Sequence, residues 1–407
     1  MIKNKLSLWT VLSRREVLSI CLFVFMADMI IGITSPTRSL FAQSLGASLT
    51  LVGILATMLG LTRLLSSMVI GAISDRQGRK SVLLIGMGFL AIACLGYALV
   101  TTPYLLLPIN IILGLGFIAT LSIAFAYAAD AVSMRERSLV IGFVATSMGL
   151  GFAVGSGIGG FSAATWGYRP TYGLASLLAG IGLVIGWASV PRERQQPPAP
   201  GQSRPSFRQQ IKLMLTDRLI LAVCAGSVLS NLVFGGLVVT FFPIYAHDLG
   251  ISQGTIGSIL AIRALISTLA RMPAGILSTV FPGQRIMLSA LVMSTLVAFS
   301  LPQSVQPPVL MIFLIGEGIA YGLFLTAGQA SIAEHADEAN RGTALGVYNA
   351  AASVGDSIAP FFLGILADAW GVRSVFYVVG ALTLLGVVMM ARSLMRYPAS
   401  LSSCPQE

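Results

Sequence analysis

The sequence predicts an all-α membrane protein of twelve transmembrane helices, arranged as two parallel six-helix repeats around a central cavity. Of its 407 residues 56% are apolar and only 10% are charged, whereas a soluble protein of this size has about 25% charged residues. The mean hydropathy is +0.87, so the apolar excess extends along the whole chain. Only helices and closed barrels satisfy the backbone in a bilayer, and the long apolar runs fit helices rather than short alternating strands.

Twelve apolar runs are long enough for a helical crossing of about 20 residues. The first run follows Lys3, Lys5, Arg14 and Arg15 but is too long for a signal peptide, so we expect it to be a retained helix. The predicted helices are 17–38, 50–73, 81–101, 104–129, 138–163, 168–190, 219–245, 253–278, 286–303, 308–333, 340–365 and 372–392.

The basic residues predict the orientation of these helices. With the N-terminus inside, 19 of the 25 Lys and Arg residues fall in inner segments. Only Arg38, Arg169 and Arg373 fall in outer loops, and three more arginines fall inside helices. This bias predicts an inner (plasma) membrane protein with both termini cytoplasmic. The net charge of +10 lies in short loops, which favours membrane orientation over nucleic-acid binding.

The chain divides into two similar halves. Residues 191–218 are rich in proline and basic residues, as expected of a cytoplasmic linker. The linker separates a first bundle, 1–190, from a second bundle, 219–407. An offset of 204 residues places the Trp166-Gly167-x-Arg169 group on Trp370-Gly371-x-Arg373 and the acid Asp130 on Glu334. A duplicated six-helix unit in the same orientation explains this match.

The segment between the second and third predicted helices holds the strongest motif. It reads Gly71-Ala-Ile-Ser-Asp75-Arg76-Gln-Gly78-Arg79-Lys80. Gly71 allows a close helix approach, Gly78 allows a tight turn, and the charges lie at the membrane interface. The segment resembles the signature loop G-x-x-x-D-R-x-G-R-K/R of the major facilitator superfamily, and the resemblance covers nearly the whole chain.

This resemblance implies a conformational latch. In the family the loop acid caps the start of helix eleven, and the loop base pairs with the acid that ends helix four. Carried to this chain, Asp75 lies near Gly342, and Arg79 pairs with Asp130. Thr279 stands at the position of Asp75 in the second half, so we expect the first half to carry the latch. The alternative interpretation is a stop signal whose basic residues only keep the loop in the cytoplasm. Such a signal would need neither Asp75 nor the glycines.

The fifth predicted helix carries a glycine-rich face. It resembles the antiporter motif G-x8-G-x3-G-P-x2-G-G of the same family, with serine in place of the proline, and favours export over uptake. Generic close packing of small residues would give a similar pattern. The residues are Gly142, Gly151, Gly155, Ser156, Gly159 and Gly160.

Charged residues inside helices are the candidates for coupling. They are costly in hydrocarbon and usually functional. The resemblance implies a cavity lined by helices one, four, seven and ten, which favours Asp28 and Glu317, with Asp356 as a third proton-coupling candidate. Burial disfavours the charged form of a carboxylate, so such a group can exchange a proton. The alternative is a structural ion pair with Arg63 or Arg263.

Polar and aromatic residues on the same helices are candidates for the substrate cavity. Some members of the family have a proton-linked arginine on helix four. Asn110 occupies the matching position in this chain, so we expect a carboxylate to carry the proton instead. Packing and interhelical hydrogen bonds would also explain these residues. The cavity candidates are Asp28, Arg63, Asn110, Asn231, Phe234, Glu317 and Tyr321.

These patterns favour a proton-coupled exporter of small amphipathic molecules that works by alternating access. We expect a monomer in a lipid bilayer whose partners are the substrate and protons, without a cofactor, a metal or a nucleic acid. No phosphate loop, metal-ligand spacing or nucleophile constellation is present, so an enzyme is not expected. Two alternatives remain: a symporter or exporter of one metabolite, such as a sugar or siderophore, and a non-transporting sensor or scaffold.

Overall fold

The computed structural model describes residues 14–133, 136–191, 218–335 and 341–396. Within these ranges twelve helical segments are long and apolar enough to cross a membrane, which confirms the predicted number. The first half contains α2 (Arg15–Thr34), α3 (Arg38–Ser44), α4 (Leu49–Gln77), α5 (Arg79–Leu99), η1 (Pro103–Leu105), α6 (Leu106–Asp130), α7 (Arg137–Trp166) and α8 (Tyr168–Ser189). The second half contains α10 (Arg218–Asn231), η2 (Leu232–Phe241), α11 (Phe242–Asp248), α12 (Gln253–Val280), α13 (Gly283–Ser300), η3 (Leu301–Gln303), α14 (Pro307–His335), α15 (Arg341–Trp370) and α16 (Val372–Arg396).

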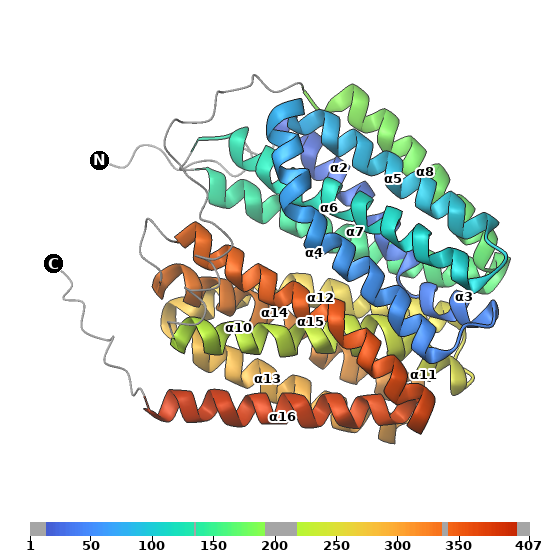
Figure 1. The fold of residues 1–407 in the computed structure, drawn as a ribbon. Helices are drawn as coiled ribbons and strands as arrows, with labels where there is room; N and C mark the ends of the chain where they lie inside the picture. Colours follow the sequence, from blue (N-terminus) through green and yellow to red (C-terminus); the bar gives the residue numbers. More distant parts are fainter. Residues whose placement is uncertain (1–13, 134–135, 192–217, 336–340, 397–407) are drawn as a thin grey trace, which may run out of the picture.

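The two halves form separate bundles that face each other, as Figure 1 shows. They meet along two helix pairs, α4 with α15 and α7 with α12. Corresponding turns have the same backbone: Gly46 and Gly250 have φ of 91° and 78°, and Gly167 and Gly371 have φ of 85° and 80°. Only glycine adopts these angles readily. The predicted repeat is therefore present in the backbone as well as in the sequence.

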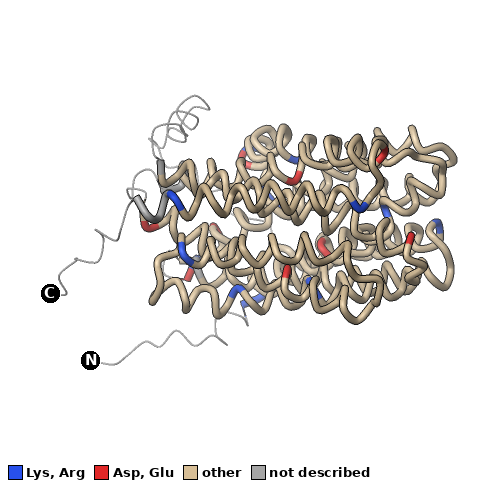
Figure 2. Tube along the Cα trace, turned by 90° about the horizontal axis from the view of Figure 1, so that it is seen from below, with Lys and Arg blue, Asp and Glu red and all other residues tan. Residues whose placement is uncertain are grey.

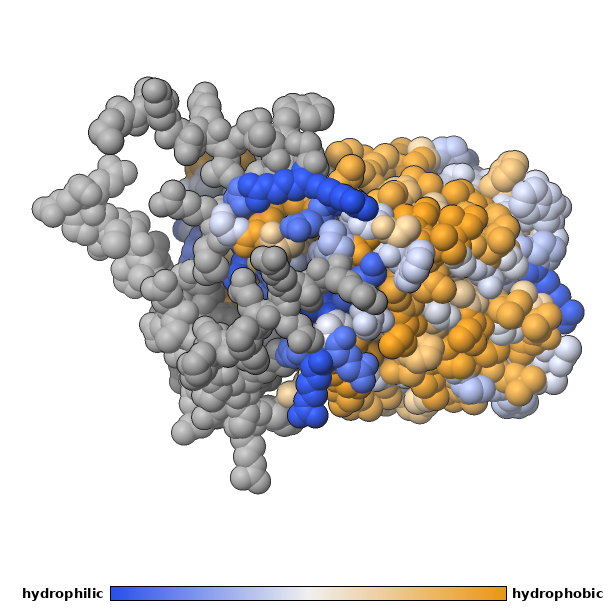
Figure 3. Space-filling model, turned by 90° about the horizontal axis from the view of Figure 1, so that it is seen from above, coloured by the Kyte–Doolittle hydropathy of each residue, from blue (hydrophilic) through white to orange (hydrophobic). Residues whose placement is uncertain are grey.

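The helix ends define two ends of the molecule. One end, which we call the basic end, carries Arg15, Arg79 and Arg137. It contains the first residues of α2, α7, α10 and α15 and the last residues of α4, α6, α14 and α16. The opposite end, here the far end, carries Leu49, Trp166, Asp248 and Trp370. Figure 2 shows few charged residues between the two ends, and Figure 3 shows a broad apolar surface there. This belt is what a hydrocarbon layer would cover.

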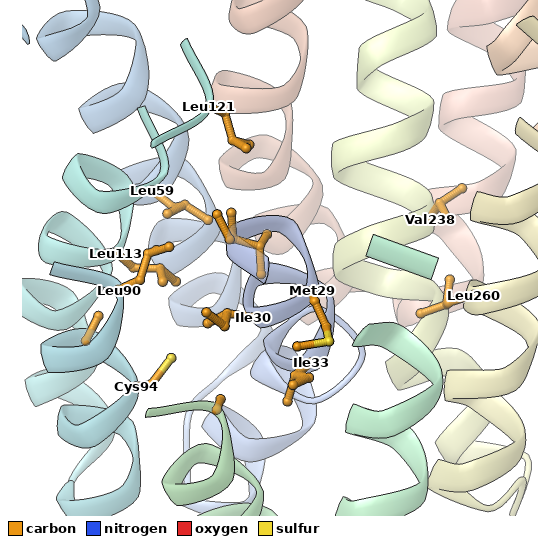
Figure 4. Packing of buried hydrophobic residues seen from close by; sticks show 14 of the residues in the cluster. Met29, Ile30, Ile33, Leu59, Leu90, Cys94, Leu113, Leu121, Val238 and Leu260 are labelled. Atoms are coloured by element: carbon orange, nitrogen blue, oxygen red, sulfur yellow. The ribbon is translucent and has the colours of Figure 1, made fainter. Parts of the chain in front are cut away.

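Helix α2 lies at the centre of the first half. It packs against α7, α8 and α6, and most of its side chains are buried. Figure 4 shows Ile30 and Ile33 of α2 between Leu90 and Leu113 on one side and Val238 and Leu260 on the other. The last two belong to η2 and α12 of the second half.

The structure corrects the predicted end of the first helix. The sequence placed Arg38 in an outer loop, but after a turn at Ser35–Thr37 the chain continues as α3 to Ser44. Leu40, Phe41 and Ala42 of α3 are buried, and burying them requires a structured chain whose backbone groups are bonded. Arg38 therefore lies on a helix that extends the first span.

The seventh span also departs from the expected regular helix. Its middle, Leu232–Phe241, is π-helical, and the Thr240 hydroxyl donates to the carbonyl of Gly235, five residues earlier, at 2.7 Å. Gly235 lies so close to Asp356 of α15 that a Cβ there would meet the Asp356 side chain at 2.7 Å. π-Helical segments are rare and frequently occur at functional sites.

Candidate functional site

Asp28 lies in the middle of α2 with 6% of its surface exposed. No hydrogen bond or ion pair joins its carboxylate to any residue that the structure describes. Its charge interacts instead with those of Arg271 on α12 and Arg63 on α4, without direct contact. A buried carboxylate without a partner is costly in its charged form. Asp28 is therefore a buried carboxylate whose charge no direct partner compensates among the described residues.

The other two candidate carboxylates are held in ion pairs. Arg263 of α12 binds Glu317 of α14, and their side chains are only 4% and 1% exposed. Arg63 of α4 binds Asp356 of α15 at 3.0 Å and thereby joins the two halves. These contacts agree with the alternative interpretation of Glu317 and Asp356 as members of structural pairs. We call Asp28, Arg63, Arg263, Arg271, Glu317 and Asp356 the central charged group.

Aromatic rings lie against two arginines of the central charged group. Phe234 and Tyr321 stack with their centroids 4.7 Å apart. The guanidinium carbon of Arg263 lies 4.6 Å from the first centroid and 5.0 Å from the second. The guanidinium carbon of Arg63 lies 4.0 Å from the ring centroid of Phe117. Such contacts hold a guanidinium in place without neutralising it.

The site offers hydrogen-bond donors without partners. Among the described residues, one buried nitrogen each of Arg63, Arg263 and Arg271 has no acceptor. The Tyr321 hydroxyl donates to Asn231 at 3.3 Å, and Asn231 donates to the Ser227 carbonyl at 2.9 Å. A substrate with acceptor groups and an apolar body therefore fits the chemistry of this site.

Asn110 lies apart from this group. Its side chain accepts from Tyr97 at 3.0 Å and donates to the Leu106 carbonyl at 2.8 Å. It lines a small cavity near the far end, and no member of the central charged group lines that cavity. Of the seven predicted cavity residues, the structure therefore brings six together and places Asn110 elsewhere.

The predicted latch residues lie at the basic end. Arg79 is 2.5 Å from Asp130 and 3.9 Å from Asp75. Gly78 has φ of 88° and makes the turn between α4 and α5, while Arg76 is exposed and Gly71 faces open space. Gly342 lies among the first residues of α15, whose side chains are outside the described part. The cap by Asp75 stays a prediction.

A second cap, at the far end, was not predicted. Asp368 near the end of α15 accepts from the backbone of Leu49 at 2.9 Å and of Thr50 at 2.7 Å, the first two residues of α4. A carboxylate at a helix N-terminus is stabilising. These bonds join the two halves at the far end. The repeat gave no signal for it, since Ala164 occupies the matching position.

Asp368 lies at the far end and Asp75 at the basic end, so replacing them should change access from the far side in opposite directions. Asp368→Asn removes charge from the cap of α4, which contributes about 0.3–1 kcal/mol. A single cysteine at Ala56 should then react several-fold faster with an impermeant thiol reagent applied to the far side. Asp75→Asn should slow that reaction, and Thr279→Val should leave it unchanged. Equal rates in all four proteins would contradict both caps.

The glycine face of α7 packs directly on backbone. Added Cβ atoms on Gly151, Gly155 and Gly159 would collide with the carbonyls of Phe25, Met29 and Ile33 of α2. On the same helix Gly160 packs against Gly257 of α12. Ser156 bonds its own helix, donating to the Phe152 carbonyl. The face therefore brings α7 close to helices of both halves.

Replacing one of these glycines should destabilise the protein. Gly155→Val forces α7 away from α2, and overpacking of this kind costs about 1–3 kcal/mol. We expect a lower unfolding midpoint and less folded protein in the membrane. Gly142→Ala on the same helix is the control, because a Cβ there meets nothing within 4 Å. Because alanine and valine both favour a helix over glycine, helix propensity cannot cause the loss, and a Gly155→Val variant as stable as Gly142→Ala would contradict the close packing.

The fold and site define a polytopic helical membrane protein whose two six-helix halves enclose a buried charged site. The Major Facilitator Superfamily model matches residues 20–245 and again residues 223–405, so the chain belongs to this superfamily.

Individual relatives include proteins named for multidrug resistance. This chain is 29% identical to Multidrug resistance protein 2 of Bacillus subtilis (strain 168) over 161 residues, which is 40% of this chain and 40% of that protein. It is 25% identical to Multidrug resistance protein MdtG of Enterobacter lignolyticus (strain SCF1), over 92% of this chain and 91% of that protein. The nucleoside transporter NupG superposes with a TM-score of 0.75 at 15% identity, over 94% of this chain and 99% of that chain.

Proposed function

We propose that the protein exports small amphipathic molecules in exchange for protons by alternating access. The observation that carries this proposal is Asp28, a carboxylate buried in α2 with no direct partner among the described residues. The multidrug names of two relatives support export of amphipathic molecules. The first of these alignments spans 40% of that relative's length.

In the proposed cycle, Asp28 takes a proton while the site is open to the outside. Once it is neutral, Asp28 no longer attracts the positive charges of Arg271 and Arg63. When the site opens inward, substrate enters beside Phe234 and Tyr321, and the Asp28 proton leaves to the cytoplasm. The pair between Arg63 and Asp356 bridges the two halves, so its rearrangement couples the site to their relative motion.

The proposal includes an orientation. The basic end lies in the cytoplasm and the far end outside, because cytoplasmic ends of membrane proteins carry the excess of Lys and Arg. Both termini and the 191–218 linker are then cytoplasmic, and a monomer in the plasma membrane suffices for transport. The latch residues Asp75, Arg79 and Asp130 close the cytoplasmic side, whereas Asp368 closes the outer side.

One alternative has an observation in its favour. The fixed donors of Arg263 and Asn231 suit a polar substrate of defined shape, and one structural relative is named as a nucleoside transporter. A symporter or exporter of one metabolite would then use the same site. The third possibility, a sensor or scaffold, does not explain the cap that Asp368 forms on α4 or the predicted cap of α15 by Asp75 at the opposite end of the same helix pair.

The test is transport by the purified protein in proteoliposomes. A panel of lipophilic drugs, nucleosides and sugars is loaded, and efflux is measured with and without an imposed pH gradient. We expect gradient-dependent movement of several unrelated amphipathic compounds. Movement of a single sugar or nucleoside would select the metabolite transporter, and no movement of any compound would support the sensor.

A further inference from the structure

A cavity of about 30 Å³ lies near the far end, and no member of the central charged group lines it. A buried water needs about 10–15 Å³ in the same measure, so the space holds one small ion or one to two waters. Its polar lining comes from Ser35, Arg38, Ser39, Tyr97, Asn110 and Thr240. Apolar side chains, among them Val52 and Leu55, form the rest.

The two serines lack partners. Ser35 and Ser39 are 1% and 6% exposed, and neither hydroxyl has a hydrogen-bond partner among the residues that the structure describes. Helical serines commonly donate to a carbonyl of the preceding turn, as Ser156 and Ser162 do here. Unsatisfied hydroxyls at this burial are costly, so a group in the cavity that accepts their hydrogen bonds would be favoured.

Arg38 supplies positive charge without a counter-charge. No described residue forms a hydrogen bond or an ion pair with its side chain. The groups that act on it electrostatically are Tyr97, Tyr172 and Cys94, which are uncharged at neutral pH, and Arg63, which repels it; none of these is a carboxylate. A partly buried guanidinium beside apolar side chains is stabilised by an anion more than by the one or two waters for which the cavity has room.

The remaining polar groups cannot supply that anion. Tyr97 donates its hydroxyl proton to Asn110, and Thr240 donates to the Gly235 carbonyl. The lining therefore combines one guanidinium, which only donates, with two hydroxyls free to donate. This set is complementary to an acceptor that carries one negative charge.

We propose that this cavity binds a single monovalent anion of the size of chloride. Its lining residues come from both halves, because Val239 and Thr240 of η2 face Ser35 and Arg38 of the first span. The site is therefore complete only while the far end is closed. A bound anion stabilises that closed state, which links transport to chloride independently of the proton-coupled cycle.

Binding is tested with radioactive chloride on purified protein and by thermal unfolding in sodium chloride or sodium gluconate at equal ionic strength. Chloride and bromide should raise the unfolding midpoint, and gluconate and sulfate should not. Replacing Ser35 and Ser39 together by alanine should weaken chloride binding about tenfold for each hydroxyl removed. Arg38→Gln should abolish binding.

The control is Ser162→Ala, which removes a buried hydroxyl that already donates to the Ile158 carbonyl. Its chloride affinity should equal that of the unaltered protein. The double serine variant keeps the charge of Arg38, so it reports on the site even if Arg38→Gln fails to fold. A cavity filled only by water would give no bound chloride and equal midpoints in chloride and gluconate, and this result would overturn the proposal.

Discussion

Asp28→Asn should abolish proton-driven transport and leave substrate binding and downhill exchange largely intact. Asparagine keeps the size of the side chain but cannot take up or release a proton near neutral pH. The measurement is proton movement coupled to substrate in proteoliposomes, with and without a pH gradient. Asp28→Glu should retain part of the coupling, because it keeps a carboxylate near Arg271 and Arg63.

Two variants separate Asp28 from the other acids. Glu16→Gln, at the basic end of the same helix, is the matched control and should transport normally. Asp28→Asn with Glu317→Gln removes both leading candidates for the proton. Proton-coupled transport at the normal rate in this double variant would eliminate both and point to Asp356, whereas substrate transport at the normal rate that ignores the pH gradient in the unaltered protein as well would mean transport without protons.

Glu317→Gln should destabilise the protein more than any other single replacement of a carboxylate discussed here. It leaves the charge of Arg263 without its partner, in a pair whose side chains are 4% and 1% exposed. Breaking one side of a buried pair costs about 3–5 kcal/mol. We expect a clear drop in the unfolding midpoint in detergent and reduced expression.

The control for this prediction removes both charges at once. Arg263→Met with Glu317→Leu should recover most of the lost stability, since apolar replacement of a buried pair is often neutral or stabilising. Asp356→Asn should cost less than Glu317→Gln, because the Arg63 side chain is 25% exposed and water can solvate it. A double variant as unstable as Glu317→Gln would show that packing, not the uncompensated charge, is responsible.

Hydropathy and repeats predicted the fold because a bilayer imposes a simple rule. Each crossing must be a long apolar helix, so the twelve runs were visible without knowledge of packing. The details that failed depend on tertiary contacts. Whether the first span continues past Ser35 as α3 is decided by the burial of Leu40 and Phe41, and the π-helical course of Leu232–Phe241 is not encoded by apolar periodicity.

The candidate site was only partly predictable, for a related reason. A charge within an apolar run is conspicuous, so Asp28, Glu317 and Asp356 could be found from the sequence. Which arginine pairs with which acid depends on helix rotation, and the sequence left Arg63 and Arg263 open as partners. Asp368 lies at a helix end where charges are ordinary, and its role is visible only because α4 begins beside it.

The central charged group has an electrical consequence. It contains three arginines and three carboxylates, so it is neutral with Asp28 ionised and carries one positive charge with Asp28 protonated. A charge that crosses the membrane gains about 2.3 kcal/mol per 100 mV. Exchange of one proton for a neutral substrate would therefore speed up as the inside becomes more negative, whereas exchange for a monovalent cation would not respond to voltage. The voltage dependence of transport thus reports the charge of the substrate before its identity is known.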